Sequence, residues 1–428
     1  MVTHQRLGQV RGNLIPEFQM RAFAVVSAIL IAIVGCCAVA PAARADDLGV
    51  TWTSQASAEN NGWYAITYGN GLFVAVARAG SANRVMTSPD GVTWTARTSA
   101  SANGWTGVAY GNGIFVAVAE AGDNNRVMTS PDGITWTART PSNVRSWRHV
   151  IYGNGLFVAV AQDGSDSGRV MTSPDGITWT SRTSAGNGSW VAVTYGNGLF
   201  VAIAWRGTNR VMTSPDGITW TARTVDTTRD WTGVTYGSGL YVAVAYAGAA
   251  GNRVMTSPDG ITWTNRASAS DNAWEWVAYG DGLFVAVADS GSGYRVMTSP
   301  DGFTWTARAS AADNAWTAVT YANGIFVAVS ESGTGNRVMT SGADQGGANL
   351  DPSQWTLVRQ ALPLPASGTC AQVADTEFAY GTGLSGGWTR AWEPWVNPAV
   401  GADGERIGGW ACTRTLVNKG GQSWLLGE

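Results

Sequence analysis

Histidine, cysteine and lysine are scarce in this chain of 428 residues. It has 2 histidines, 4 cysteines and a single lysine, Lys419, and only 13% of its residues are charged. His149 is the only histidine beyond the N-terminal region, which excludes zinc sites built from several histidines and limits Ser-His-Asp chemistry to one position. A net charge of −3 gives no electrostatic argument for nucleic-acid binding. We therefore expect no metal, no cofactor and no nucleic-acid partner.

The first 45 residues have the organisation of an export signal. Arg11 and Arg21 precede an apolar run over 22–40, and "PAARADD" offers a small-residue cleavage site after Ala45. We expect residues 1–45 to be a signal peptide and the protein to be secreted or held at the cell surface. Two alternatives remain open: the apolar run is long enough for an uncleaved anchor, and "IVGC" resembles a bacterial lipoprotein signal that would place a lipid on Cys36.

The C-terminal region differs in composition from the rest of the chain. After a predicted linker over 359–368, residues 369–428 contain five tryptophans and the only two cysteines of the mature chain, Cys370 and Cys412. Two cysteines in an exported chain most often pair, so we predict a disulfide that stabilises a small β-rich module. Its tryptophans fit either a core or a surface on which carbohydrate stacks.

Residues 46–358 are organised by an internal repeat. Seven tryptophans, each five residues before a tyrosine, recur every 41 to 43 residues; they are Trp63, Trp105, Trp147, Trp190, Trp231, Trp274 and Trp316. Each unit reads as four short strands separated by Asn-Gly and Pro-Asp-Gly turns, and no helical periodicity is present. This pattern predicts an all-β protein, a seven-bladed β-propeller of four-stranded repeats of about 42 residues.

The phrase "SPDGITW" occurs almost unchanged in six units. It resembles the Asp box of sialidases and their relatives, a hairpin also known as the BNR repeat. In that family the box serves folding: its aspartate accepts backbone hydrogen bonds, its tryptophan packs beneath the turn, and it lies away from the catalytic pocket. The resemblance implies structural roles for Asp90, Asp132, Asp175, Asp216, Asp259 and Asp301.

The seven units offer eight candidates for their fourth strand. The seventh unit lacks the phrase, and "GVTWTS" at 49–54 precedes the first unit. We expect residues 49–54 to complete the last blade and close the ring, which would leave 353–358 outside it. The alternative gives the place to Trp355 and leaves 49–54 at an edge.

The repeat also bears on catalysis. Sialidases bind the carboxylate of their substrate with three arginines. The arginines before each "VMTS" occupy equivalent positions of the repeat, so in a closed ring they lie at the same distance from the central axis. They therefore cannot converge on one ligand without residues from other positions. We expect them to bridge to the backbone of the neighbouring blade or to stack on tryptophan, and a ring of weak anion sites is the alternative. The favoured function is non-catalytic binding or adhesion, with a glycan or an extracellular protein as ligand. A sialidase-like glycoside hydrolase and a purely structural scaffold are the alternatives.

A binding site is expected where units depart from the repeat, on the face that carries the variable loops. The two residues after each repeat tryptophan are mostly small, but the third unit has Arg148 and His149 and the sixth has Glu275 and Trp276. We predict that these four residues line a pocket at the channel mouth, with Tyr64 and Trp205 at its edge. The alternative is that these side chains only fill the centre of the propeller.

Overall fold

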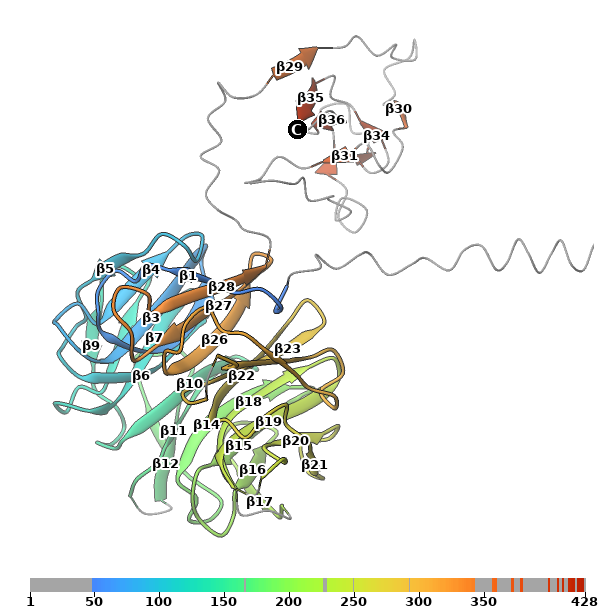
Figure 1. Ribbon diagram of the computed structural model, residues 1–428. Coiled ribbons are helices and arrows are strands. Elements are labelled where there is room, and N and C mark those ends of the chain that lie inside the picture. Colours follow the sequence, from blue (N-terminus) through green and yellow to red (C-terminus); the bar gives the residue numbers. More distant parts are fainter. Residues whose placement is uncertain are drawn as a thin grey trace, which may run out of the picture. The chain divides into compact units, whose positions relative to one another are not determined.

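The computed structural model describes residues 48–342, except 165–166, 226–228, 249 and 292, and a series of short strands beyond residue 342. The described residues form strands, turns and loops, and no helix among them has the length and apolar character needed to cross a membrane. Seven four-stranded antiparallel sheets follow one another around a ring (Figure 1). This confirms the predicted all-β, seven-bladed propeller.

Each blade is a meander of consecutive strands. Blades one to three consist of β2 (Gly62–Gly69), β3 (Leu72–Ala79), β4 (Val85–Ser88), β5 (Thr95–Arg97); β6 (Gly104–Gly111), β7 (Ile114–Ala121), β8 (Val127–Ser130), β9 (Thr137–Arg139); and β10 (Trp147–Gly153), β11 (Leu156–Ala161), β12 (Ser167–Ser173), β13 (Thr180–Thr183). Blades four to six consist of β14 (Trp190–Gly196), β15 (Leu199–Ala204), β16 (Val211–Ser214), β17 (Thr221–Arg223); β18 (Asp230–Gly237), β19 (Leu240–Ala247), β20 (Val254–Ser257), β21 (Thr264–Arg266); and β22 (Trp274–Gly280), β23 (Leu283–Ala288), β24 (Val296–Ser299), β25 (Thr306–Arg308). Blade seven contains β26 (Trp316–Ala322), β27 (Ile325–Ser330), β28 (Val338–Gly342) and β1 (Thr53–Gln55).

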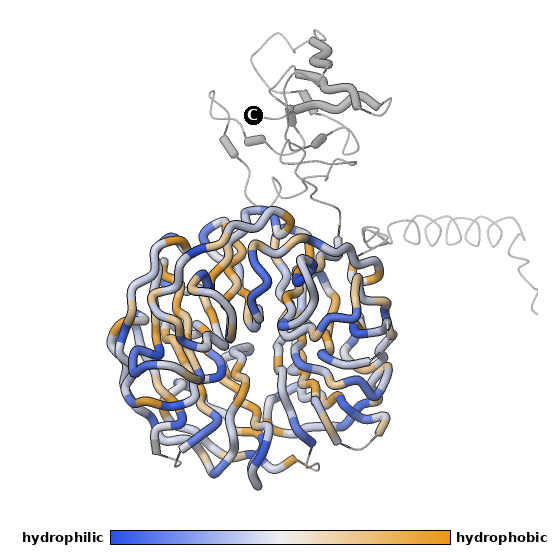
Figure 2. Tube along the Cα trace, turned by 60° about the vertical axis from the view of Figure 1, so that its left-hand side comes forward, coloured by the Kyte–Doolittle hydropathy of each residue, from blue (hydrophilic) through white to orange (hydrophobic). Residues whose placement is uncertain are grey.

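The second strand of every blade is buried on both faces. In β3, Phe73 and Ala75 pack with Val327 of blade seven, whereas Val74 and Val76 pack with blade two. This double burial explains the unbroken apolar sequence "LFVAVA". Figure 2 shows such hydrophobic stretches within the blades. The core is therefore a set of layers between neighbouring blades.

The first turn of each blade needs residues that tolerate a positive φ. In blade one Asn70 has φ 47° and Gly71 has φ 77°, as a tight two-residue hairpin requires. The glycine before this turn has a different role. A Cβ on Gly69 would lie 2.1 Å from the Tyr110 ring of the next blade, so the repeated "YG" allows adjacent blades to approach closely.

The aspartates of the six repeated turns accept hydrogen bonds within their own hairpins. Asp216 Oδ1 accepts from the backbone N–H groups of Ile218 (2.9 Å) and Thr219 (2.8 Å), and these bonds hold the pKa of Asp216 below its usual value. The same pair of backbone bonds recurs in the other five turns. These hydrogen bonds explain why the turn sequence is repeated in six blades. That the aspartates have no role beyond the turn stays a prediction.

The repeated arginines link each blade to the next. Arg84 Nη1 donates to the backbone oxygen of Asn103 at 2.9 Å, two residues before the repeat tryptophan of blade two. The equivalent bond is made by Arg126, Arg169, Arg210, Arg253, Arg295 and Arg337. The expected bridge to the neighbouring backbone is therefore present in all seven blades.

The N-terminal strand closes the ring. Strand β1 pairs with β28 in the register Thr53↔Thr340, Ser54↔Met339 and Gln55↔Val338. The expectation that the segment over 49–54 completes the last blade is thus confirmed.

The closing turn is assembled from both ends of the propeller. Gly49 N–H donates to Ser341 Oγ at 2.8 Å, as Gly91 N–H does to Ser88 Oγ in blade one. Trp52 Nε1 donates to the backbone oxygen of Gly49 at 3.2 Å, the counterpart of the bond from Trp to Gly in the other turns. Leu48 stands where the other six turns have their aspartate, and it is buried between blades six and seven.

Beyond residue 342 the backbone forms one four-stranded and two two-stranded sheets. The strands are β29 (Thr356–Arg359), β30 (Ala371–Gln372), β31 (Phe378–Ala379), β32 (Ala399–Val400), β33 (Arg406–Ile407), β34 (Trp410–Ala411), β35 (Thr415–Lys419) and β36 (Gln422–Leu426). Among the described strands, β29 pairs with β35 and with no strand of a blade, as expected if β1 closes the ring. Cys370 and Cys412 lie outside the described residues, as do the signal peptide, Cys36 and the linker beyond Arg359. In the sequence these two cysteines directly flank the Ala371↔Ala411 pair of β30 and β34.

Candidate functional site

A cavity of about 330 Å³ lies where the first strands of all seven blades begin. In blade one the register pairs Trp63 with Ala77, which places the start of the first strand beside the end of the second and its variable loop. The residue directly after each repeat tryptophan lines the cavity. We call these residues the first ring: Tyr64, Thr106, Arg148, Val191, Thr232, Glu275 and Thr317.

A second ring comes from the position directly after the apolar core of each second strand. Six of its members line the cavity, namely Arg78, Gln162, Trp205, Tyr246, Asp289 and Glu331. The seventh, Glu120, is 9% exposed and interacts with two residues of the wall. Of these seven residues, only Trp205 could be predicted from the sequence as part of the site. The sequence does mark this position, because it begins the variable loop and its residue type differs between almost all of the blades.

All six predicted site residues line this one cavity. Arg148 and His149 come from blade three, and Glu275 and Trp276 from blade six. The alternative, that large side chains only fill the centre, holds in part for one of them. His149 is 9% exposed, its ring packs edge-on against Trp276 at 4.6 Å between centroids, and its Nδ1 accepts from Val193 N–H at 3.4 Å. Burial lowers the pKa of His149 to about 4, so this residue forms a neutral part of the wall.

Threonines of the first ring position the larger residues of the next blade. Thr106 Oγ1 donates to the backbone oxygen of Trp147 at 2.7 Å, directly before Arg148. Thr232 and Thr317 make the same bond ahead of Glu275 and Tyr64, respectively. In blades two and five a glycine follows the threonine, and a Cβ on Gly233 would lie 2.8 Å from Trp276 Cα. Small residues in one blade therefore make room for the large ones in the next.

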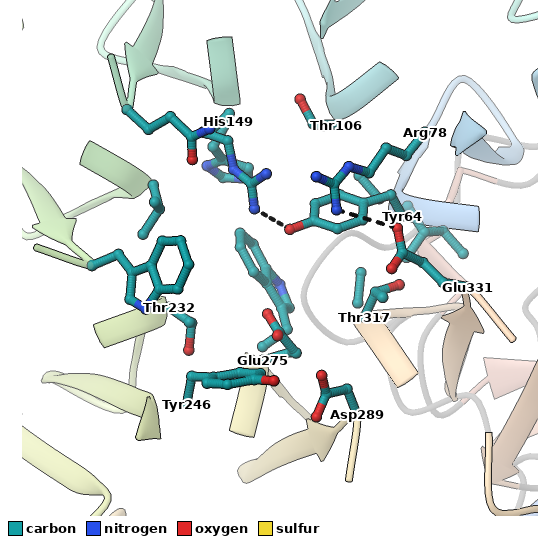
Figure 3. Close-up of a pocket in the computed structure, with 18 of the residues that line it drawn as sticks. Tyr64, Arg78, Thr106, His149, Thr232, Tyr246, Glu275, Asp289, Thr317 and Glu331 are labelled. Carbon is teal, nitrogen blue, oxygen red and sulfur yellow. Dashed lines mark hydrogen bonds and ion pairs between the residues drawn. The ribbon is translucent and has the colours of Figure 1, made fainter. Parts of the chain in front are cut away.

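One side of the cavity carries a continuous ionic network, of which Figure 3 shows the ion pair between Arg78 and Glu331. Arg78 pairs with Glu120 and lies 3.7 Å from Glu331, measured from Nη1 to Oε1. Arg148 pairs with the same Glu120 and donates to the Tyr64 hydroxyl. Both arginines of the wall thus have carboxylate partners within the protein. We call this part the paired side of the cavity.

The other side combines aromatic rings with carboxyl groups (Figure 3). We call it the aromatic–acidic side; its members are Trp205, Tyr246, Trp276, Glu275 and Asp289. Burial, together with the nearby charge of Asp289, raises the pKa of Glu275 to about 8. Burial also raises the pKa of Asp289, although the Tyr246 hydroxyl donates to its carboxylate. At neutral pH Glu275 is therefore mostly protonated and able to donate a hydrogen bond.

Two chemical properties limit what the site can do by itself. Burial raises the pKa of Tyr64 to about 12, so this phenol stays protonated rather than serving as an activated nucleophile. Among the described residues no group of three or more His, Cys, Asp or Glu side chains is placed to hold a metal ion. Asp289 and Glu331 also reach this cavity from the second ring, so its lining contains carboxyl groups besides that of Glu275.

Comparisons with known proteins show the fold. No protein-family model and no curated protein matches the chain. Virginiamycin B lyase from Staphylococcus aureus, solved with quinupristin, is similar with a TM-score of 0.59 at 10% identity, over 68% of this chain and 99% of that one. YCF48 bound to a D1 peptide has a TM-score of 0.52 at 15% identity, over 68% and 96%. Both are seven-bladed propellers. At these identities the likeness concerns architecture alone, and the resemblance to sialidases rests on the turn motif.

Proposed function

We propose that this protein is an exported, non-catalytic binding propeller that holds part of its ligand in the cavity on the variable-loop face. One observation carries the proposal: the positions that break the repeat lie far apart in the sequence, yet they line one cavity. The residues that are the same in every blade are sufficient to form the blades. Residues that differ between blades and yet line one cavity therefore indicate a role other than folding.

The ion pairs and hydrogen bonds of the residues that line the cavity favour binding over sialidase chemistry. Gripping a ligand carboxylate requires arginines that are free to face it, whereas Arg78 and Arg148 are already paired with Glu120. Tyr64 is hydrogen-bonded to Arg148, and its pKa is raised rather than lowered.

A protein segment is the ligand class that we favour. YCF48, which shares this architecture, was solved with a peptide bound. The indoles of Trp205 and Trp276 suit a peptide side chain, and they also suit a sugar ring, which keeps glycans as the second ligand class.

Glycoside hydrolysis is the second candidate function, and one observation favours it. Glu275, with its pKa raised to about 8, has the property of a general acid, and Asp289 supplies a second carboxyl group in the same cavity. A panel of fluorogenic glycosides tests it. Turnover by the wild type that Glu275→Gln abolishes would establish hydrolysis and replace the binding proposal.

Binding is tested by probing a peptide array and a glycan array with labelled protein. The variant joins Glu275→Thr and Trp276→Ala, which installs the Thr-Ala pair of blade seven. The control is Asp281→Asn, which gives the turn between β22 and β23 the residue found in five other blades. We expect the wild type and the control to retain the same spots and the double variant to lose them. Equal binding by all three proteins, or no spot retained by the wild type, would contradict the proposal.

A further inference from the structure

The charges of the cavity are unevenly balanced. Two arginines, Arg78 and Arg148, face four carboxyl groups: Glu120, Glu275, Asp289 and Glu331. The arginines contact only Glu120 and Glu331, on the paired side. Arg295, which lies near Asp289, directs Nη1 to backbone oxygens and links blade six to blade seven. The carboxyl groups of the aromatic–acidic side therefore have no ion-pair partner within 4 Å among the described residues.

Two polar atoms on this side are buried without a partner. Asp289 Oδ1 and Trp205 Nε1 have no hydrogen-bond partner among the described residues. The Tyr246 and Ser290 hydroxyls hydrogen-bond the Asp289 carboxylate, and its Oδ1, which is an acceptor only, is free to accept from a ligand donor as well. A hydrogen-bonded ammonium or guanidinium is such a donor and carries the charge that offsets the carboxylates.

The aromatic rings fit the same ligand. Trp205, Tyr246 and Trp276 line the cavity beside Glu275 and Asp289. Aromatic faces attract cations through their quadrupole, and rings combined with carboxylates form the sites that recognise organic cations. One such contact already exists at the edge of this side, where Arg206 Cζ lies 4.6 Å from the centroid of the Trp205 ring.

We propose that the aromatic–acidic side binds a cationic group of the ligand, an alkylammonium or a guanidinium. This inference deepens the proposed binding function and rests on it. It also argues against acidic sugars as ligands, because both arginines of the paired side already contact a carboxylate and the Asp289 carboxylate repels anions. Binding of the cation favours the ionised form of Glu275, so it releases protons near neutral pH.

Matched small probes test the inference by ligand-observed NMR titration of the full mature protein. The first pair is 3,3-dimethylbutylammonium, whose ammonium carries N–H donors, and 3,3-dimethylbutan-1-ol, which has nearly the same shape without the charge. Methylguanidinium is the second cation, and it distinguishes an arginine-like from an alkylammonium ligand. N-acetylneuraminate is the anion. We expect at least one cation to bind at least about tenfold more tightly than the neutral isostere, as cation–π and carboxylate contacts together predict.

Variants assign the effect to its residues. Asp289→Asn and Trp276→Ala should each weaken the binding of the preferred cation by about tenfold, whereas Asp281→Asn on the opposite face should leave it unchanged. No saturable binding of either cation, or an affinity of both cations no greater than that of 3,3-dimethylbutan-1-ol, would overturn the inference. Saturable binding of N-acetylneuraminate that the Glu275→Thr, Trp276→Ala protein loses would also overturn it, while leaving the proposed binding function intact.

Discussion

Replacing Glu275 by glutamine should make the protein more stable at high pH and leave it nearly unchanged at low pH. Glutamine has the shape of protonated glutamic acid, so the native structure keeps its packing. Burial and the charge of Asp289 raise the pKa of Glu275 from 4.5 to about 8. Native Glu275 thus retains a proton that the unfolded chain has already lost at neutral pH.

The magnitude follows from proton linkage. Below pH 4.5 both states are protonated, and Glu275 costs no stability. Between pH 4.5 and about 8 the native state binds more protons than the unfolded state, so the free energy of unfolding falls as pH rises. The slope is about 1.4 kcal/mol per pH unit, which amounts to about 5 kcal/mol across the window. Above pH 8 the deficit is constant.

Other groups near Glu275 require a difference measurement. Its pKa also responds to Arg148, Glu331 and Arg78, and these groups are present in both proteins. Urea unfolding of the wild type and Glu275→Gln should therefore be compared at pH 5, 6.5 and 8, with Asp281→Asn as the control. We expect the advantage of the variant to grow with pH. An advantage that is the same at pH 5 and pH 8 would refute the reasoning, because it would mean that Glu275 ionises as it does in water.

Three further predictions concern the fold. Trp52→Ala should lower the free energy of unfolding by about 3–5 kcal/mol, because Trp52 is buried where the ring closes; a loss below about 1 kcal/mol in urea unfolding would show that the closing strand is dispensable. Asp216→Ala should cost about 1–2 kcal/mol through its lost turn bonds and leave array binding intact at low temperature; loss of binding with an unchanged melting curve would assign Asp216 to a ligand site. Cys370 and Cys412 should form a disulfide, and two free thiols in peptide maps of the secreted protein under non-reducing conditions would rule it out.

The blades could be predicted because their determinants are local. The Asn-Gly turn requires a positive φ at adjacent residues, and Asn70 and Gly71 supply it within one hairpin. An unbroken apolar strand requires cover on both faces, which a ring of blades provides. Even the closing strand could be identified, because Trp52 belongs to a recognisable copy of the repeated turn.

The cavity could be predicted only in part, because its second ring depends on geometry between blades. The first ring stands at a fixed distance from each repeat tryptophan, so its exceptional residues could be found by comparing units. Glu120 joins Arg78 to Arg148 across three blades, and no spacing in the sequence indicates this contact. The proximity of Asp289 to Glu275 likewise appears only once the ring is closed.

The central claim, that ligand binds in the cavity and not on the constant turns, is tested most directly by hydroxyl-radical footprinting. The protein would be oxidised with and without the strongest-binding peptide or glycan from the arrays, and the modified residues identified by mass spectrometry. We predict protection of Trp205, Tyr246 and Trp276, with no change at Ile177 and Ile218, which are exposed in the constant turns of the opposite face. Protection of these isoleucines, with unchanged oxidation of the three aromatic residues, would contradict the account.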